Sequence, residues 1–137
     1  MTVIVIDASS LAKYLLHEEN WDKIEAYLLR TVHSIDHVLK EVSNAIWKHV
    51  YVYRRIPIDL GLELYDALRR LVKERIILLE RQELYLDEAF RISLNRGLSI
   101  YDSLYIAQAL KFGELLTSDV KQAKEAEELG LRVHLVE

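Results

Sequence analysis

Short apolar runs recur along the chain and are separated by longer segments of mixed polarity. The first run, Val3–Ile6, contains only β-branched residues and stops at Asp7, a pattern typical of a strand buried on both faces. Runs this short and this apolar favour parallel pairing, with helices covering both faces of the sheet. The predicted strands are Val3–Ile6, Thr31–Ile35, Ile76–Leu79, Leu115–Thr117 and Val133–Val136.

The longer segments between these runs carry apolar residues three or four positions apart, which is the spacing of helices. Pro57 marks a break between two of them, because proline interrupts a helix interior. Gly97, Gly113 and Gly130 stand where helices are expected to end. The expected helices run through Leu11–Leu16, Trp21–Leu29, His37–Arg55, a segment from Pro57 to near Arg75, 82–96, Ile100–Phe112 and Val120–Leu129.

The alternation of strands and helices predicts one α/β domain, residues 1–137, in a three-layer α/β/α arrangement. We expect a short parallel sheet of about 4–5 strands flanked by helices. The length of 137 residues fits a single core. A composition of 51% hydrophobic and 29% charged residues excludes a disordered chain.

The composition also limits the chemistry. The absence of cysteine excludes a disulfide scaffold, a thiolate nucleophile and a cysteine zinc site. The net charge of −4 argues against a protein that holds nucleic acid through bulk positive charge alone. The N-terminal apolar run is too short for a signal peptide or a membrane span, so we expect a cytoplasmic protein without membrane association.

Two acids follow predicted strands. Asp7 ends the first strand, and Asp119 comes shortly after the fourth. In open parallel sheets the functional crevice lies at the carboxyl ends of the strands, so both acids are candidates for a site there. Each also precedes a predicted helix and could simply be its N-cap, although Ser9 and Ser118 offer other capping side chains at the same junctions.

Two further acids lie inside predicted helices. Glu41 borders an apolar stripe that includes Val38 and Val42, and Asp102 stands in a helix that is apolar nearly all round. An unpaired buried carboxylate is costly, so each must be neutralised, hydrogen-bonded or bound to a cation. A solvated surface acid remains an alternative for Glu41, as does a helix cap for Asp102.

Convergence of these four acids would require a cation or raised pKa values. Two like charges 4 Å apart repel by about 4 kcal/mol at an effective dielectric constant of 20. An all-oxygen site suits Mg²⁺ or Mn²⁺, which can activate a water for displacement at phosphorus. The spacing of His33, His37 and Glu41 would suggest zinc only on one continuous helix, whereas Thr31–Ile35 is predicted as a strand. Phosphodiester hydrolysis is therefore the predicted chemistry.

Four short motifs, each weak by itself, contain these acids. They are Val5–Leu11 (VIDASSL), Glu41–Trp47 (EVSNAIW), Tyr101–Ala107 (YDSLYIA) and Leu116–Asp119 (LTSD). In this order the motifs resemble those of the PIN-domain nucleases, in particular the VapC-type toxins of toxin–antitoxin pairs. The resemblance covers essentially the whole chain.

The resemblance implies a metal-dependent endoribonuclease with one or two Mg²⁺ or Mn²⁺ ions, the toxin of a type II toxin–antitoxin system. Asp7 and Asp102 would be the principal ligands. The implied partners are RNA, a VapB-type antitoxin and a second copy of the chain, in a homodimer or a toxin–antitoxin hetero-oligomer. The implied catalytic and metal-site acids, with two supporting hydroxyls, are Asp7, Glu41, Asp102, Asp119, Ser9 and Thr117.

Assigning four negative charges to a metal site leaves the rest of the chain neutral, since −4 + 4 = 0. Lys13, Lys121 and Lys124 could then contact RNA phosphates, with Lys13 the strongest candidate. Trp47 and Tyr51 are expected to pack in the core or on a partner surface. Two other functions stay open: a PIN enzyme of RNA processing or quality control, and an inactive PIN fold that only binds a partner.

Overall fold

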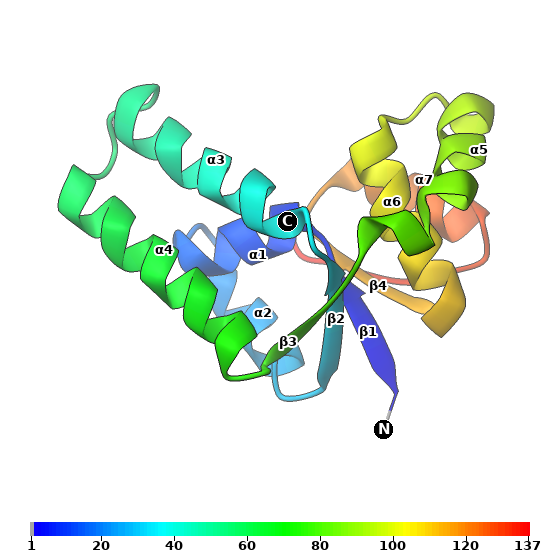
Figure 1. Ribbon diagram of the computed structural model, residues 1–137, viewed down its shortest axis with the longest axis horizontal. Coiled ribbons are helices and arrows are strands. Elements are labelled where there is room, and N and C mark those ends of the chain that lie inside the picture. The colour runs from blue at the N-terminus through cyan, green and yellow to red at the C-terminus, as the bar shows by residue number, and fades with distance from the viewer. Residues whose placement is uncertain (1) are drawn as a thin grey trace.

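The computed structural model describes residues 2–137 and shows a five-stranded parallel sheet with helices on both faces (Figure 1). The strands are β1 Val3–Ile6, β2 Thr31–Ile35, β3 Ile77–Glu80, β4 Glu114–Thr117 and β5 Arg132–Leu135. The helices are α1 Ala8–Leu15, α2 Trp21–Tyr27, α3 Val38–Tyr51, α4 Ile58–Lys73, α5 Leu86–Arg96, α6 Ile100–Phe112 and α7 Val120–Glu128.

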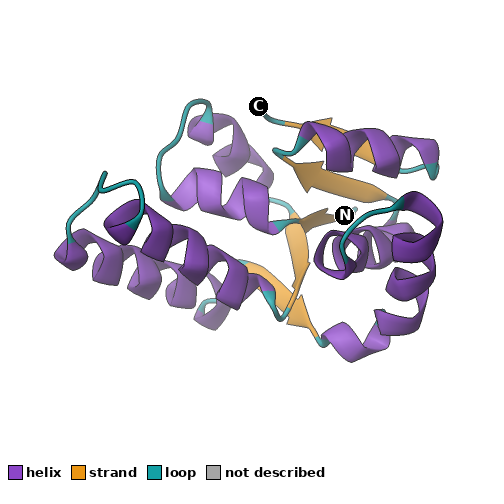
Figure 2. Cartoon of the chain, turned by 90° about the horizontal axis from the view of Figure 1, so that it is seen from above, coloured by secondary structure: helices purple, strands orange, loops and turns teal. Residues whose placement is uncertain are grey.

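The sheet has the strand order β3-β2-β1-β4-β5, which places β1 at its centre. Helices α1, α2 and α4 lie on one side of the strands, and α5, α6 and α7 lie on the other (Figure 1). Figure 2 shows the strands enclosed between helices when the molecule is seen from above. The predicted α/β fold with parallel strands is therefore confirmed.

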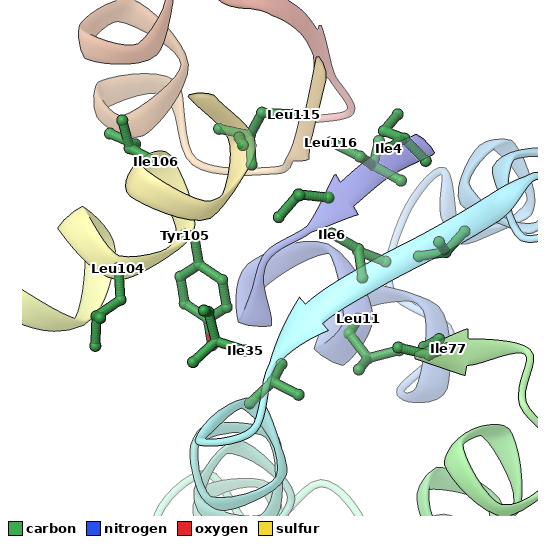
Figure 3. Close-up of a cluster of buried hydrophobic side chains, with 14 of the residues drawn as sticks. Ile4, Ile6, Leu11, Ile35, Ile77, Leu104, Tyr105, Ile106, Leu115 and Leu116 are labelled. Carbon is green, nitrogen blue, oxygen red and sulfur yellow. The ribbon is translucent and has the colours of Figure 1, made fainter. Parts of the chain in front are cut away.

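The core forms where the central strands meet α6. Ile4, Val5 and Ile6 of β1 are fully buried, as their uninterrupted β-branched run predicts. Helix α6 packs across β1, β2 and β4, which explains why it is apolar nearly all round rather than on one face. Figure 3 shows side chains of these strands gathered with Leu104, Tyr105 and Ile106 of α6.

The sequence-based boundaries lie within about three residues of the observed ones for most elements, with two larger differences. The helix expected over 82–96 is divided into a 3₁₀ turn, Gln82–Leu84, and α5. Tyr85 lies between them with φ of −118°, outside helical geometry, and its hydroxyl donates to Glu80 Oε1 at 2.7 Å. The helix expected to reach Arg55 ends earlier, at Tyr51, and Arg54 adopts a left-handed φ of 52°.

The aromatic side chains of α3 do not join the core. Trp47 is 51% exposed and Tyr51 is 53% exposed. Core packing was therefore the wrong expectation for these two residues, because α3 leaves the sheet and packs with α4 instead. Among residues 2–137, no helix is long and apolar enough to cross a membrane.

The topology opens a crevice beside β1. The chain adds β2 and β3 on one side of β1, and β4 and β5 on the other. Ile6 of β1 is in register with Leu116 of β4, and the Asp7 amide donates to the Leu116 carbonyl at 3.2 Å. The segments that follow these two neighbouring strands therefore begin side by side, at the switch point where open α/β sheets place their ligands.

Candidate metal centre

A cavity of about 270 Å³ lies at this switch point, where the start of α1, the first turns of α3 and α6, and the start of α7 meet. Its walls combine four acids with small side chains, which leave the space open. The lining residues are Asp7, Ala8, Ser9, Ala12, Glu41, Ala45, Asp102, Tyr105 and Asp119.

Asp7 is the most deeply buried of the four acids, with an exposed fraction of 3%. Its Oδ1 caps α1 by accepting from the Ser10 amide at 3.0 Å, and it also accepts from Ser9 Oγ at 2.7 Å. Thr117 Oγ1 donates to Oδ2 at 2.5 Å. Burial raises the pKa of Asp7 to about 6, although these three hydrogen bonds lower it in part.

Serine and threonine hydroxyls connect the two loops that follow β1 and β4. Thr117 Oγ1 accepts from the Asp119 amide at 3.1 Å, and Ser9 Oγ accepts from the Ser118 amide at 3.0 Å. The hydroxyls of Ser10 and Ser118 are 2.8 Å apart. The loops are thus fixed relative to each other, and with them Asp7 and Asp119.

Asp102 is not the cap of its own helix. Ser99 caps α6 by accepting from the Asp102 amide at 3.2 Å, so the Asp102 carboxylate takes no part in capping. Burial raises the pKa of Asp102, and the nearby charges of Asp119 and Glu41 raise it further. The ammonium group of Lys121 acts in the opposite direction. The capping alternative was therefore wrong for Asp102.

Asp119 is an exposed acid that does cap a helix. Its Oδ1 accepts from the Gln122 amide at 3.1 Å at the start of α7. Asp7 and Asp119 are thus caps and cavity acids at once, so the two interpretations of these residues are compatible.

Glu41 lies in the first turn of α3 and is partly exposed. Its Oε1 accepts from the Tyr105 hydroxyl at 2.8 Å. His37 Nε2 lies 2.6 Å from the same oxygen, at an angle outside that of a hydrogen bond. Burial raises the pKa of Tyr105, and the Glu41 charge raises it further, so the hydroxyl stays protonated and donates. The alternative of an ordinary surface acid was therefore wrong for Glu41.

The three candidate lysines lie outside the lining of the cavity. Lys121 is close enough to Asp102 for its charge to lower the pKa of that carboxyl. Lys13 Nζ donates instead to the Glu19 carbonyl at 3.1 Å. Lys124 is exposed on α7 and does not line the cavity.

The zinc alternative is wrong, because His33 lies apart from the neighbouring pair His37 and Glu41. His33 lies on β2, and its Nδ1 is 3.6 Å from Glu80 Oε1.

The sequence analysis did not identify Tyr105 and His37 as neighbours of the cavity. Helical spacing could have indicated both, since Tyr105 is one turn after Asp102 and His37 is one turn before Glu41.

The donor set of the cavity fits a hard divalent cation. All four charged groups are carboxylates, and Ser9 adds a hydroxyl. Within residues 2–137, no three or more His, Asp or Glu side chains lie close enough together to hold a metal ion by themselves. An open arrangement suits Mg²⁺ and Mn²⁺, since Mg²⁺ in particular keeps several waters and takes only one or two carboxylates directly.

Comparisons with known proteins point to one family. The sequence model of the PIN domain matches residues 4–128. Ribonuclease VapC3 of Pyrobaculum aerophilum is 30% identical over 130 residues, which cover 89% of this chain and 93% of that protein.

Two crystal structures share the fold. PAE2754 of Pyrobaculum aerophilum superposes with a TM-score of 0.65 at 25% identity, over 96% of this chain and 89% of that chain. VapC20 of Mycobacterium tuberculosis, a toxin that cleaves the sarcin–ricin loop, has a TM-score of 0.65 at 16% identity, over 94% and 96% of the two chains. At that identity the likeness to VapC20 concerns the fold alone.

Proposed function

The chain belongs to the PIN-domain family, and from this membership we propose that residues 1–137 form one PIN domain acting as a metal-dependent endoribonuclease. We further propose that it is the toxin of a type II toxin–antitoxin pair, since its relative is a ribonuclease named VapC3. The observation that carries the proposal is the gathering of four carboxylates around one cavity at the switch point of the sheet.

The four acids would hold Mg²⁺ or Mn²⁺, one ion or two, with Asp7 and Asp102 as the principal ligands. A bound divalent cation lowers the pKa of a coordinated water and stabilises charge that develops on phosphate oxygens. Glu41 and Asp119 would bind the cation directly or through waters. Four acids around 270 Å³ match this role, because their mutual repulsion is relieved by positive charge.

The residues around Asp7 would orient its carboxylate toward the cation. Thr117 and Ser9 donate to its two oxygens, and the Ser10 amide fixes the carboxylate against α1. A ligand held by three hydrogen bonds loses little freedom on binding, which favours a precise site. The raised pKa of Asp7, about 6, implies that binding at mildly acidic pH releases a proton.

The RNA backbone would approach the cavity at the start of α7. Lys121 is the best placed of the candidate lysines, since its charge already acts on Asp102. Lys13 and Lys124 would contact more distant phosphates. Such contacts position the strand without reading its sequence.

The proposed setting is the cytoplasm, with a VapB-type antitoxin as regulatory partner and assembly as a homodimer or a toxin–antitoxin hetero-oligomer. The name of VapC3 supports this partnership. Exposed aromatic residues such as Trp47 and Tyr51 on α3 are compatible with a protein partner. No particular contact favours either alternative function, a PIN enzyme of RNA processing or quality control or an inactive PIN fold that only binds a partner.

The test is metal-dependent cleavage of RNA by Asp7→Asn and Asp102→Asn. Each is expected to lose roughly 100-fold or more in rate, since removing even an outer contact of a metal ligand costs 10–100-fold. Asp66→Asn serves as the matched control because Asp66 is an exposed acid on α4, outside the cavity. Full activity in both site variants would refute the proposed site.

A further inference from the structure

A buried tyrosine links the two helices that flank the acidic cavity. Tyr105 on α6 is 1% exposed, and its hydroxyl donates to Glu41 Oε1 on α3 across 2.8 Å. The two residues are 64 positions apart, so only the tertiary fold brings them together. Tyr105 lines the cavity without carrying charge, which sets it apart from the four acids.

The two oxygens of the Glu41 carboxylate have different surroundings. Oε1 accepts from Tyr105 and lies 2.6 Å from His37 Nε2. Among residues 2–137, Oε2 has no hydrogen-bond or ion-pair partner. Oε2 is therefore the oxygen of Glu41 that is available to a ligand in the cavity.

The Tyr105 ring is itself held in place. The buried ring of His37 packs against it with centroids 4.9 Å apart, and the His37 ring centroid is 5.8 Å from that of Tyr101. A phenol packed in this way has little freedom to swing away from Glu41. A glutamate fixed beforehand loses less rotamer freedom when it binds a cation than a free side chain does.

We propose that Tyr105 is a positioning residue of the metal site, whose hydroxyl holds Glu41 Oε1 so that Oε2 is presented to the divalent cation. The inference rests on the proposed function, because it assigns Tyr105 a task toward that cation. Tyr105 acts only through Glu41 and contacts neither cation nor RNA. Removing a hydrogen-bond partner of a metal-ligating side chain typically lowers the affinity for the metal by 10–100-fold.

The experiment compares Tyr105→Phe with Tyr85→Phe. Tyr85 is a matched control, since it is 8% exposed and its hydroxyl donates to a glutamate, Glu80, at 2.7 Å outside the cavity. Binding of Mn²⁺ to each protein without RNA is measured by isothermal titration calorimetry. Tyr105→Phe is expected to bind Mn²⁺ about 10-fold more weakly than the parent protein, and Tyr85→Phe to bind it equally well.

Thermal unfolding in EDTA separates positioning from folding. Each variant loses one hydrogen bond from a buried phenol to a carboxylate, so similar decreases in Tm are expected. A double-mutant cycle with Glu41→Gln then identifies the route of the effect. In the Glu41→Gln background, Tyr105→Phe should weaken Mn²⁺ binding no further.

Three outcomes would overturn the inference. They are unchanged Mn²⁺ affinity in Tyr105→Phe, an undiminished loss in the Glu41→Gln background, and an equal loss in Tyr85→Phe. Failure of the parent protein to bind Mn²⁺ would instead remove the proposed metal site and this inference together.

If Tyr105→Phe does not fold, Mg²⁺ is titrated into the parent protein and the NMR signal of the Tyr105 hydroxyl is followed. A signal that persists and shifts supports the inference, and one that disappears contradicts it.

Discussion

At the scale of single residues, the burial of Asp7 in the cavity lowers the stability of the metal-free protein. Its carboxylate is almost fully buried and accepts three hydrogen bonds, yet no cationic side chain contacts it among the described residues. Burial raises its pKa from 3.8 to about 6. Ionised Asp7 therefore destabilises the metal-free fold at neutral pH by about 3 kcal/mol, at about 1.4 kcal/mol for each pKa unit.

We therefore predict that Asp7→Asn stabilises the metal-free protein while it lowers the proposed RNA-cleavage rate by roughly 100-fold or more. Because the folded-state pKa is raised, the stability of the parent protein decreases as the pH rises through about 6. Asn keeps an acceptor for the Ser10 amide, so the cap of α1 is retained. Thermal unfolding in EDTA should show a higher Tm for Asp7→Asn at pH 7.5, with the gain shrinking toward pH 4.

Asp119→Asn is the control, because Asp119 caps α7 from an exposed position and no similar gain is expected. An Asp7→Asn variant that melts below the parent protein at pH 7.5 would contradict the prediction.

Much of the candidate site could be predicted at this scale, because an acid after a buried strand or inside an apolar helix is unusual enough to stand out. Tyr105 does not stand out in this way, since a tyrosine in an apolar helix is common, and only its spacing of one turn from Asp102 could have indicated it. Lys13 was favoured by its distance from Asp7 along the chain, whereas its ammonium group is bound by the Glu19 carbonyl. Side-chain direction at the end of a helix depends on the following loop, which spacing does not describe.

At the scale of elements, a second charged network joins β4 and β5 to the segment after α2. Arg30 donates to both oxygens of Glu114, at 3.1 and 3.0 Å, and His134 Nε2 lies 2.8 Å from Oε2. Tyr27 on α2 contacts His134 Nδ1 at 3.2 Å. The hydrogen bond from Arg30 is the main cause that lowers the pKa of Glu114 to about 2, with His134 contributing.

Glu114→Gln should therefore destabilise the protein by about 2 kcal/mol at pH 7, because it leaves Arg30 without its counter-charge. A lowered folded-state pKa means that Glu114 stabilises the fold above its unfolded pKa, with the effect lost as the pH falls toward 2. Urea unfolding at several pH values measures this difference. Glu83→Gln is the control, since its ion pair with Arg81 is largely exposed and should contribute little. Equal stability losses in both variants would contradict the prediction.

The bounds of some helices and strands could be predicted from the sequence, and those of others could not. Thr31–Ile35 and Ile100–Phe112 begin and end as predicted. The first segment is rich in β-branched residues, which favour strands, and the second ends at a glycine, Gly113, with φ of 96°. The break at Tyr85 could not be predicted, since no proline or glycine marks it in the sequence. Trp47 suggested core packing, although α3 extends away from the sheet.

At the scale of the whole molecule, the order of the strands brings distant parts of the chain to one edge. The β1–β4 pairing is the contact that places Asp7 beside the loop containing Asp119. A cation bound between them would stabilise the folded state alone, because the unfolded chain keeps these acids apart. The alternating pattern predicted this architecture, since parallel strands with helical connections have few possible arrangements.

Millimolar Mg²⁺ or Mn²⁺ is accordingly expected to raise the Tm of the parent protein. At 100 times the Kd, the gain in the free energy of unfolding is about 2.7 kcal/mol. Differential scanning fluorimetry with metal and with EDTA measures the shift, and Asp102→Asn should show little of it. An equal shift in Asp102→Asn would assign the bound metal to another place on the protein.

The pairing of β1 with β4 also has a consequence during synthesis. Ile6 and Leu116 are in register although most of the chain separates them, so the cavity depends on one of the longest-range contacts in the fold. A nascent chain on the ribosome that has not yet released residues 114–119 has Asp7 and Glu41 but neither the β4 neighbour of Asp7 nor the Thr117 hydroxyl that orients it. The acidic cavity therefore forms only after residues 114–119 have left the ribosome, so the proposed antitoxin, if made at the same time, would have an interval in which to be present first.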